Sequence, residues 1–296
     1  MNKLPVGQVI REAYVFTFTE IGTVIGLTWI PTVINTVASY FMFRAYVVTL
    51  EGLGTGATTP ADSQAILPLP LAILCLFMVG MVGVALTRQV LGIRKGPAFA
   101  HFALGGEEFR AFAGFVGVYL MTLLFVLLLM VVVGSVAVMM GGAAGSAAGG
   151  IAGLAGIVGV FLMIYAVVRL GYLLVPSVVV DGQFGLTRSW QLTKGNFWRI
   201  VAILLATLMP LALISDVASA LVIGSLPTAA DATQPTDLAG VARIWADQLH
   251  ETMPHLPALM GVSLVLAPLG YSLLFTPAAL AYRILAGKAI IQAHDG

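Results

Sequence analysis

The chain has 296 residues, of which 59% are hydrophobic and only 9% charged, whereas soluble domains carry about 25% charged residues. A soluble fold of this composition would expose large apolar patches, so the composition excludes an ordinary soluble protein and favours an integral membrane protein. The formal net charge of +1 offers no field for nucleic acid, and the single cysteine, Cys75, excludes an intrachain disulfide and a metal site built on paired cysteines.

The N-terminal segment predicts an amphipathic helix over about 4–18, lying at the inner membrane surface. Lys3 and Arg11 precede the first long apolar run, which begins only at Ile21. We therefore expect no cleavable signal peptide, and we expect the first membrane helix to act as the targeting signal.

Six apolar runs are long enough to cross a bilayer as helices, which requires roughly 20 residues each. The stretch from Ala111 to Val168 has no charged side chain and is too long for one helix, so we interpret it as two helices with a tight connection. The fold class is therefore an all-α integral membrane protein with one polytopic domain over 1–296. The predicted spans cover about 21–43, 66–87, 112–138, 150–175, 199–223 and 258–286.

The distribution of lysine and arginine predicts that both termini lie on the inner side. With that orientation only Arg44 and Arg243 fall outside. The inner side then holds Lys3, Arg11, Arg88, Arg94, Lys95, Arg110, Arg169, Arg188, Lys194, Arg199, Arg283 and Lys288. This asymmetry indicates a multi-pass protein of a bacterial inner membrane.

The spans are compatible with three parallel two-helix repeats. Each odd-numbered span follows an amphipathic stretch on the inner side, at about 4–18, 98–110 and 184–195. Residues 31–39 of the first span are similar in sequence to residues 210–219 of the fifth. Apolar sequences also resemble one another by chance, so the repeat stays a hypothesis.

Glycines recur every fourth residue at Gly141, Gly145, Gly149 and Gly153. On a helix they would form a smooth face that admits another backbone, whereas off a helix they would form a flexible loop. We expect a loop near 140–147, followed by a close-packed start to the fourth span.

Three charged residues are candidates for intramembrane roles. Arg169 lies toward the end of the fourth span, where it either faces a partner such as Glu20 or snorkels to the inner headgroups. Asp216 lies about sixteen residues into the fifth span, nearer the outer interface than the centre, with Arg44 as a candidate partner. A proton relay through Asp216 is not favoured.

The inner loop 176–199 predicts a short interfacial helix over 184–195, with Phe184 and Leu186 dipping toward the lipid. Gly195 suits a left-handed position that ends this helix, and Asn196 suits the N-cap of the fifth span. The candidate lipid-contacting residues are Arg188, Trp190, Lys194, Trp198 and Arg199. Anionic headgroups of the inner leaflet are the predicted partners. The same features also suit any chain that re-enters a membrane, so a purely structural role stays open.

This loop also carries a resemblance. After Pro176 and the Asp181-Gly182 pair, residues 189–198 have the pattern Ser-Trp-x-Leu-Thr-x-Gly-x-Phe-Trp. Over 169–199 the sequence resembles the membrane domain that accompanies some glycerophosphodiester phosphodiesterases, and related stand-alone six-helix inner-membrane proteins, which often have glutamate where this chain has Asp181. The family's catalytic barrel needs a His-Arg pair, which this sequence lacks. The resemblance implies a membrane fold and a connection with lipids, but not hydrolysis.

The outer segment predicts one amphipathic helix over 237–252, capped by Asp237, with Leu238, Val241, Trp245 and Leu249 on one face. His250, Glu251 and His255 superficially suggest a zinc-protease helix. Their spacing is wrong because that motif needs histidines four residues apart, and Pro254 interrupts the helix. We therefore expect no metal and no cofactor.

Three functional hypotheses follow. The first is a non-catalytic protein that binds or organises membrane lipid. The second is a secondary transporter or channel for a small solute or ion, which Arg169 and the mid-span prolines Pro31, Pro210 and Pro268 would suit. The third is a lipid-headgroup enzyme using Asp181 and Arg188, ranked last because they form no acid–base or metal set. A homo-oligomer or a partner membrane protein is compatible with each.

Overall fold

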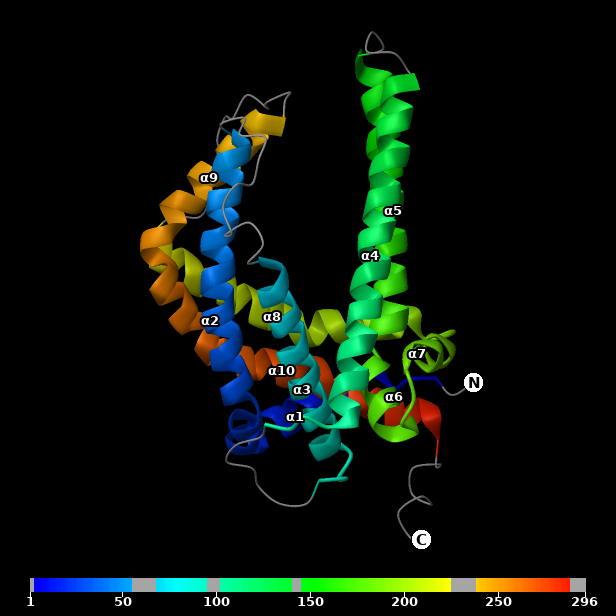
Figure 1. The fold of residues 1–296 in the computed structure, drawn as a ribbon. Coiled ribbons are helices and arrows are strands. Elements are labelled where there is room, and N and C mark those ends of the chain that lie inside the picture. Colours follow the sequence, from blue (N-terminus) through cyan, green and yellow to red (C-terminus); the bar gives the residue numbers. More distant parts are fainter. Residues whose placement is uncertain (1–2, 55–67, 95–101, 140–144, 225–237, 288–296) are drawn as a thin grey trace.

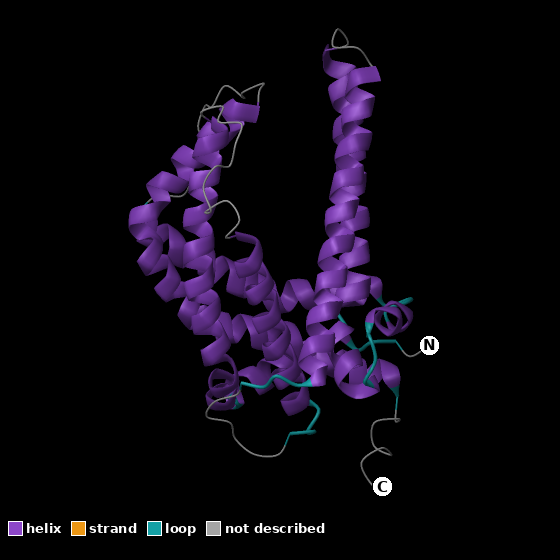
Figure 2. Cartoon of the chain, in the orientation of Figure 1, coloured by secondary structure: helices purple, strands orange, loops and turns teal. Residues whose placement is uncertain are grey.

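The computed structural model describes residues 3–54, 68–94, 102–139, 145–224 and 238–287. All regular secondary structure in these ranges is helical (Figure 2). Six helices are long and apolar enough to cross a membrane, so the protein is a multi-pass helical membrane protein. They are α2 (Ile21–Gly54), α3 (Pro68–Val90), α4 (Gly106–Met139), α5 (Gly145–Gly171), α8 (Phe197–Ile223) and α10 (Leu256–Ala286).

Two of these helices differ most from the predicted spans. α2 continues to Gly54, well past the predicted end at 43, because its last turns pack against helix α9 (Leu238–Thr252). α5 ends at Gly171, and a separate helix α6 (Leu174–Asp181) follows. Pro176 explains this break, because within a continuous helix its ring would clash with the carbonyl of Tyr172, whereas the first turn of a new helix tolerates it.

The molecule has two arms that rise from a common base (Figure 1). One arm is the α4–α5 hairpin. The other contains α2, α9 and the first half of α10, with α3 packed along α2. Helices α8 and α10 run obliquely between the base and this second arm.

The base consists of α1 (Val6–Thr19), α6, α7 (Leu186–Leu192), the start of α8 and the end of α10. Leu4 and Ala286, near the two ends of the chain, lie in the same apolar cluster, so both ends of the described chain meet here. Six spans, an even number, place both ends on the same side of the membrane, as the shared cluster requires. The assignment of the base to the inner side stays a prediction from the charge distribution.

Polar contacts fasten α1 to helices that lie far along the sequence. The Thr17 and Ser272 hydroxyls are 2.7 Å apart and both buried. Glu12 forms an ion pair with Arg283 at 3.4 Å. Between α3 and α4, Arg88 forms a two-point contact with Glu107, at 3.0 and 2.9 Å. These contacts make the base, with the adjoining ends of α3 and α4, a polar and closely connected part of the structure.

Helices are present at 6–19 and 186–192, where the sequence predicts interfacial helices. The amphipathic or polar-aromatic stretch at 98–110 forms no separate helix in its described part. Residues 95–101 lie outside the described ranges, 102–105 are non-helical, and α4 already begins at Gly106. Acidic side chains in the first turn, Glu107 and Glu108, favour that start because they complement the positive end of the helix.

The mid-span prolines do not break their helices. Pro31, Pro210 and Pro268 each lie inside a continuous helix, in α2, α8 and α10 respectively. The unwound segments that secondary transporters use to bind ions are therefore not present at these three positions.

Candidate functional site

Arg169 lies in the last turn of α5 and is 6% exposed. Nη2 donates a 2.7 Å hydrogen bond to the carbonyl of Trp190, and Nη1 donates one of 2.8 Å to the hydroxyl of Tyr165. Nε donates a longer one, 3.4 Å, to Thr193. A guanidinium has five N–H donors, so these bonds occupy only part of its capacity.

Aromatic rings surround the Arg169 guanidinium. Its carbon lies 3.8 Å from the ring centroid of Trp190 and 5.4 Å from that of Tyr165. Tyr165 also packs against Phe197 at 4.7 Å, and Phe197 packs edge-on against Trp198. The negative faces of such rings stabilise a cation by about 0.5–2 kcal/mol per contact without neutralising it.

Two residues of the Ser-Trp-x-Leu-Thr pattern attach α7 to the end of α5. The Ser189 hydroxyl donates to the carbonyl of Arg169 at 2.8 Å and accepts from the amide of Leu173 at 3.3 Å. Thr193 approaches the same carbonyl at 3.4 Å. Both are fully buried, so they satisfy backbone groups that the end of α5 leaves open. Gly195 then adopts a φ of 79°, as predicted, and α8 begins two residues later.

Arg169 faces partners inside the structure, as one of its two predicted environments has it, but Glu20 is not among them and the snorkelling alternative is wrong. Its side chain does not snorkel to the surface, because α7 covers it. Nor does it meet Glu20, which is exposed at the α1–α2 junction and accepts a hydrogen bond from Thr23. Among the described residues, no carboxylate forms an ion pair with Arg169. The charge is therefore solvated by dipoles and rings.

The five predicted lipid-contacting residues do not form one cluster. Trp190 covers Arg169, whereas Arg188 faces the opposite side of α7 and pairs with Asp181 at 3.4 Å. Arg199 donates to the carbonyl of Leu4 at 2.9 Å. Lys194 and Trp198 are exposed beside the contact of Arg169 with α7, and neither takes part in it.

Asn196 has an unexpected partner. It occupies the N-cap position of α8, as predicted, but its side chain makes no capping hydrogen bond there. Its Oδ1 instead accepts from the amide of Leu4 at 3.1 Å. Nothing in the pattern around Asn196 distinguishes these two uses of an amide, so sequence analysis missed this contact.

Asp181 and Arg188 lie together in a polar pocket of about 630 Å³ beside α6 and α7. Asp181 also accepts a 2.8 Å hydrogen bond from the hydroxyl of Tyr282. Its carboxylate therefore has two donors already, which suits a structural link between α6, α7 and α10.

Asp216 is exposed on α8. In the part of the chain that the structure describes, no ion pair joins it to Arg44, whose guanidinium lies 5.9 Å from the ring of Tyr40. The predicted pairing of Arg44 with Asp216 is therefore wrong.

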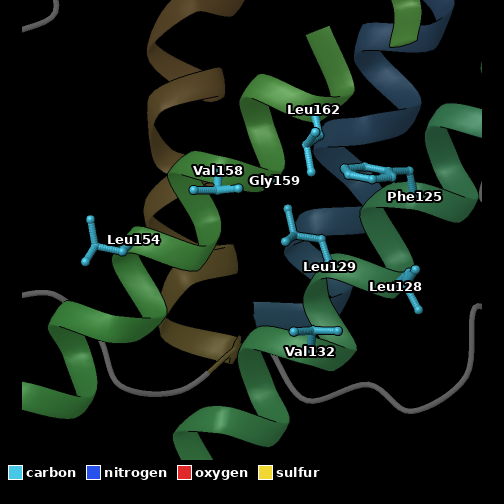
Figure 3. A pocket seen from close by; sticks show the side chains of 8 residues that line it. All are labelled: Phe125, Leu128, Leu129, Val132, Leu154, Val158, Gly159 and Leu162. Atoms are coloured by element: carbon cyan, nitrogen blue, oxygen red, sulfur yellow. The ribbon is translucent and has the colours of Figure 1, made fainter. Parts of the chain in front are cut away.

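An apolar groove between α4 and α5 was not predicted. Its volume is about 490 Å³, and the described residues that line it are all hydrocarbon side chains apart from one glycine (Figure 3). The lining residues are Phe125, Leu128, Leu129 and Val132 of α4 with Leu154, Val158, Gly159 and Leu162 of α5. Uniformly apolar helices give no signal for a groove, since every face looks alike in the sequence.

We call the contact of Arg169 with Tyr165, Trp190 and Thr193, where α5 meets α7, the Arg169 junction. The groove and this junction share one face of α5. Leu154, Val158, Leu162, Tyr165 and Arg169 follow one another at intervals of three or four residues, which aligns them along a helix. Leu154 lies fifteen residues from Arg169, or about 22 Å at 1.5 Å per residue. These five side chains thus form one stripe on α5, which runs from the positive, aromatic Arg169 junction into the apolar groove.

The predicted outer helix is present as α9. Trp245 is 56% exposed, and the neighbouring Ala246 is buried instead. A small residue there allows α9 to lie close against α2. His250 of α9 contacts Glu51 of α2. The predicted cap, Asp237, and the glycines at 141–144 lie outside the described residues.

The described residues contain no group of three or more histidine, cysteine, aspartate or glutamate side chains arranged to hold a metal ion. No family model, curated protein or solved structure matches this chain. The functional argument therefore rests on the geometry of the site.

Proposed function

We propose that this protein binds phospholipid of the bacterial inner membrane, as a lipid-binding or membrane-organising accessory protein. The observation that carries the proposal is the continuous stripe on α5, on which Arg169 and the apolar groove share one helix face. An anionic headgroup fits the positive end of the stripe, and an acyl chain fits the groove.

Electrostatics favours an anion at the Arg169 junction. A buried charge is weakly screened, and Arg169 has no ion-paired carboxylate among the described residues. Lys194 adds an exposed positive charge next to Thr193, and Trp198 adds an exposed aromatic ring suited to the headgroup region. Basic residues near an anionic leaflet each contribute about 1 kcal/mol to lipid attraction.

The dimensions also fit a phospholipid. The stripe of about 22 Å is longer than half of a hydrocarbon core that is roughly 30 Å thick, so one acyl chain can follow it from the interface. The resemblance of residues 169–199 to a membrane-domain family with a lipid connection supports the same proposal.

The test is lipid analysis by mass spectrometry of protein purified in a mild detergent, compared with whole-membrane extract. We expect enrichment of an anionic phospholipid in the wild type. Val158→Phe, which fills the groove, should remove that enrichment. Val160→Phe is the matched control, because Val160 is similarly exposed on α5 but does not line the groove. Lys194→Gln should reduce the enrichment about fivefold.

Retained lipid that mirrors the bulk membrane would contradict the proposal. Equal lipid retention by Val158→Phe and Val160→Phe would show that the groove does not bind the lipid. The transport alternative predicts flux of a solute into liposomes that carry the wild-type protein, and such flux with unselective lipid retention would favour it instead.

A further inference from the structure

A second pocket lies between α2 and α10, remote in sequence from the α5–α7 junction. Its volume is about 300 Å³. Polar side chains on one face of each helix line it together with apolar ones. The polar members are Thr32, Asn35, Thr36 and Ser39 of α2 with Ser263 and Tyr271 of α10. On α2 they are spaced three and four residues apart, so they share one face of the helix.

The pocket contains an amide with unused hydrogen-bonding capacity. Nδ2 of Asn35 donates to the hydroxyl of Tyr271 at 2.9 Å, while Oδ1 of Asn35 is buried and has no hydrogen-bond partner among the described residues. The hydroxyl proton of Tyr271 remains free to donate. Turning the amide over would exchange these roles, but the pair would still offer both a donor and an acceptor. A ligand hydroxyl, which donates and accepts, satisfies either arrangement.

The threonines beside Asn35 add acceptors. Thr32 and Thr36 each donate to the backbone carbonyl four residues earlier, at 2.7 and 2.8 Å, which uses their protons and leaves oxygen lone pairs. An unsatisfied polar group within a membrane protein is costly, so a partner for the free acceptor is strongly favoured.

Within the described ranges, no charged side chain lines this pocket, and this determines the charge of the occupant. A phosphate or ammonium group would lie about 21 Å along α2 from Ile21 without a counter-ion, at a position where charge is expensive. The apolar remainder of the lining suits hydrocarbon. Ser263 at the rim is exposed, whereas Thr32 is 2% exposed, so the pocket extends from the helix surface to a buried floor.

We propose that this pocket binds the headgroup of an uncharged lipid with a free hydroxyl, of the diacylglycerol class. The site is separate from the Arg169 junction, so the proposal stands or falls independently of phospholipid binding. The hydroxyl of the lipid donates to Oδ1 of Asn35 and accepts from Tyr271, while its chains leave along the apolar surface of α10.

The test uses the full chain in phosphatidylcholine nanodiscs with a diazirine-bearing diacylglycerol as the probe. We expect cross-links that map to 32–43 and 256–271. Unlabelled dioleoylglycerol should compete, whereas trioleoylglycerol, which lacks the hydroxyl, should compete about tenfold more weakly, as expected for one lost hydrogen bond in an apolar site. Equal competition, or cross-links elsewhere only, would overturn the proposal.

Two variants sharpen the test. Asn35→Leu, of similar size, and Tyr271→Phe should each weaken competition by dioleoylglycerol about tenfold and leave that by trioleoylglycerol unchanged. Ser135→Ala is the control, because Ser135 is exposed on α4 and bonds only to the carbonyl of Val131. Unchanged competition in both pocket variants would overturn the proposal.

The chain carries an internal reporter that does not depend on cross-linking. Cys75 of α3, the single cysteine, lies beside Ser39 of the pocket. Dioleoylglycerol should slow alkylation of Cys75 by N-ethylmaleimide in the wild type, but not in Asn35→Leu. Protection that persists in Asn35→Leu would show that hydrocarbon alone fills the pocket. Thermal unfolding of each variant separates loss of binding from loss of fold.

Discussion

The base and the α4–α5 hairpin are stabilised by different interactions. In the base, buried hydroxyls, a buried guanidinium and an amide join helices that are distant in sequence, as in the contacts of Thr17 with Ser272 and of Asn196 with Leu4. In the described part of the hairpin, no hydrogen bond joins α4 to α5, and none of the most apolar eighteen residues of α4 is buried.

This difference follows from the solvent of each region. Lipid is as apolar as leucine, so the hairpin gains little from burying its side chains and is held mainly by close packing. The base gains more from hydrogen bonds, because its buried polar groups would otherwise have no hydrogen-bond partners, which is costly. A rigid base can hold the Arg169 junction in place while the hairpin exposes a groove to hydrocarbon.

The largest effect is expected from Arg169→Met. The variant loses three hydrogen bonds and the contact with the Trp190 ring, so we expect a loss of about 3 kcal/mol in stability. Denaturation in mixed micelles measures it, and limited proteolysis within 182–197 should accelerate as α7 detaches. Arg169→Lys keeps the charge but not the planar fork, so it should recover only part of the stability. Wild-type stability in Arg169→Met would show that α7 docks without the guanidinium.

The sequence predicted the membrane class, the six spans and the role of Gly195, because each depends on local composition or backbone geometry. It did not predict the partners of Arg169 or Asn196. Those partners lie in α7 and at Leu4, and their contacts depend on how separate helices meet. The helix break before Pro176 could have been predicted from the sequence, since the constraint of proline on a helix is local. The α4–α5 groove could not, because its lining is uniformly apolar.

The packing of the hairpin is tested by Gly159→Leu. A Cβ at Gly159 would lie 2.5 Å from a methyl group of Leu129, so α4 and α5 must separate or Leu129 must repack. We expect a loss of about 2 kcal/mol, measured by the same denaturation. Gly156→Leu is the control, because a Cβ there would have no neighbour within 4 Å. Equal changes in stability at both positions would mean that the effect comes from helix propensity and not from packing between α4 and α5.

A smaller effect is expected from Asn196→Ala. It removes the acceptor for the Leu4 amide and should cost about 1 kcal/mol. Hydrogen exchange at residues 4–10 should accelerate while exchange in α8 changes little, since Asn196 makes no side-chain cap there. Faster exchange confined to the start of α8 would contradict this assignment.

The smallest effect is expected from Arg188→Gln. Its ion pair with Asp181 is solvent-exposed, and such pairs contribute no more than about 0.5 kcal/mol. Stability should stay within error of the wild type, and added salt should not change the difference. A large loss would place Arg188 among the residues that hold the base together and would weaken the contrast with Arg169.

The partners of α1 have a consequence for biosynthesis. Leu4, Glu12 and Thr17 are made first, yet they bond to Asn196, Arg283 and Ser272, which leave the ribosome much later. Four spans, α2, α3, α4 and α5, are therefore made before the partner of α1 in α8. The contacts of α1 with α10 form only when the last span has been inserted. Closure of the base is thus a late step of assembly, and a chain truncated before α8 would leave the polar face of α1 open to quality-control proteases.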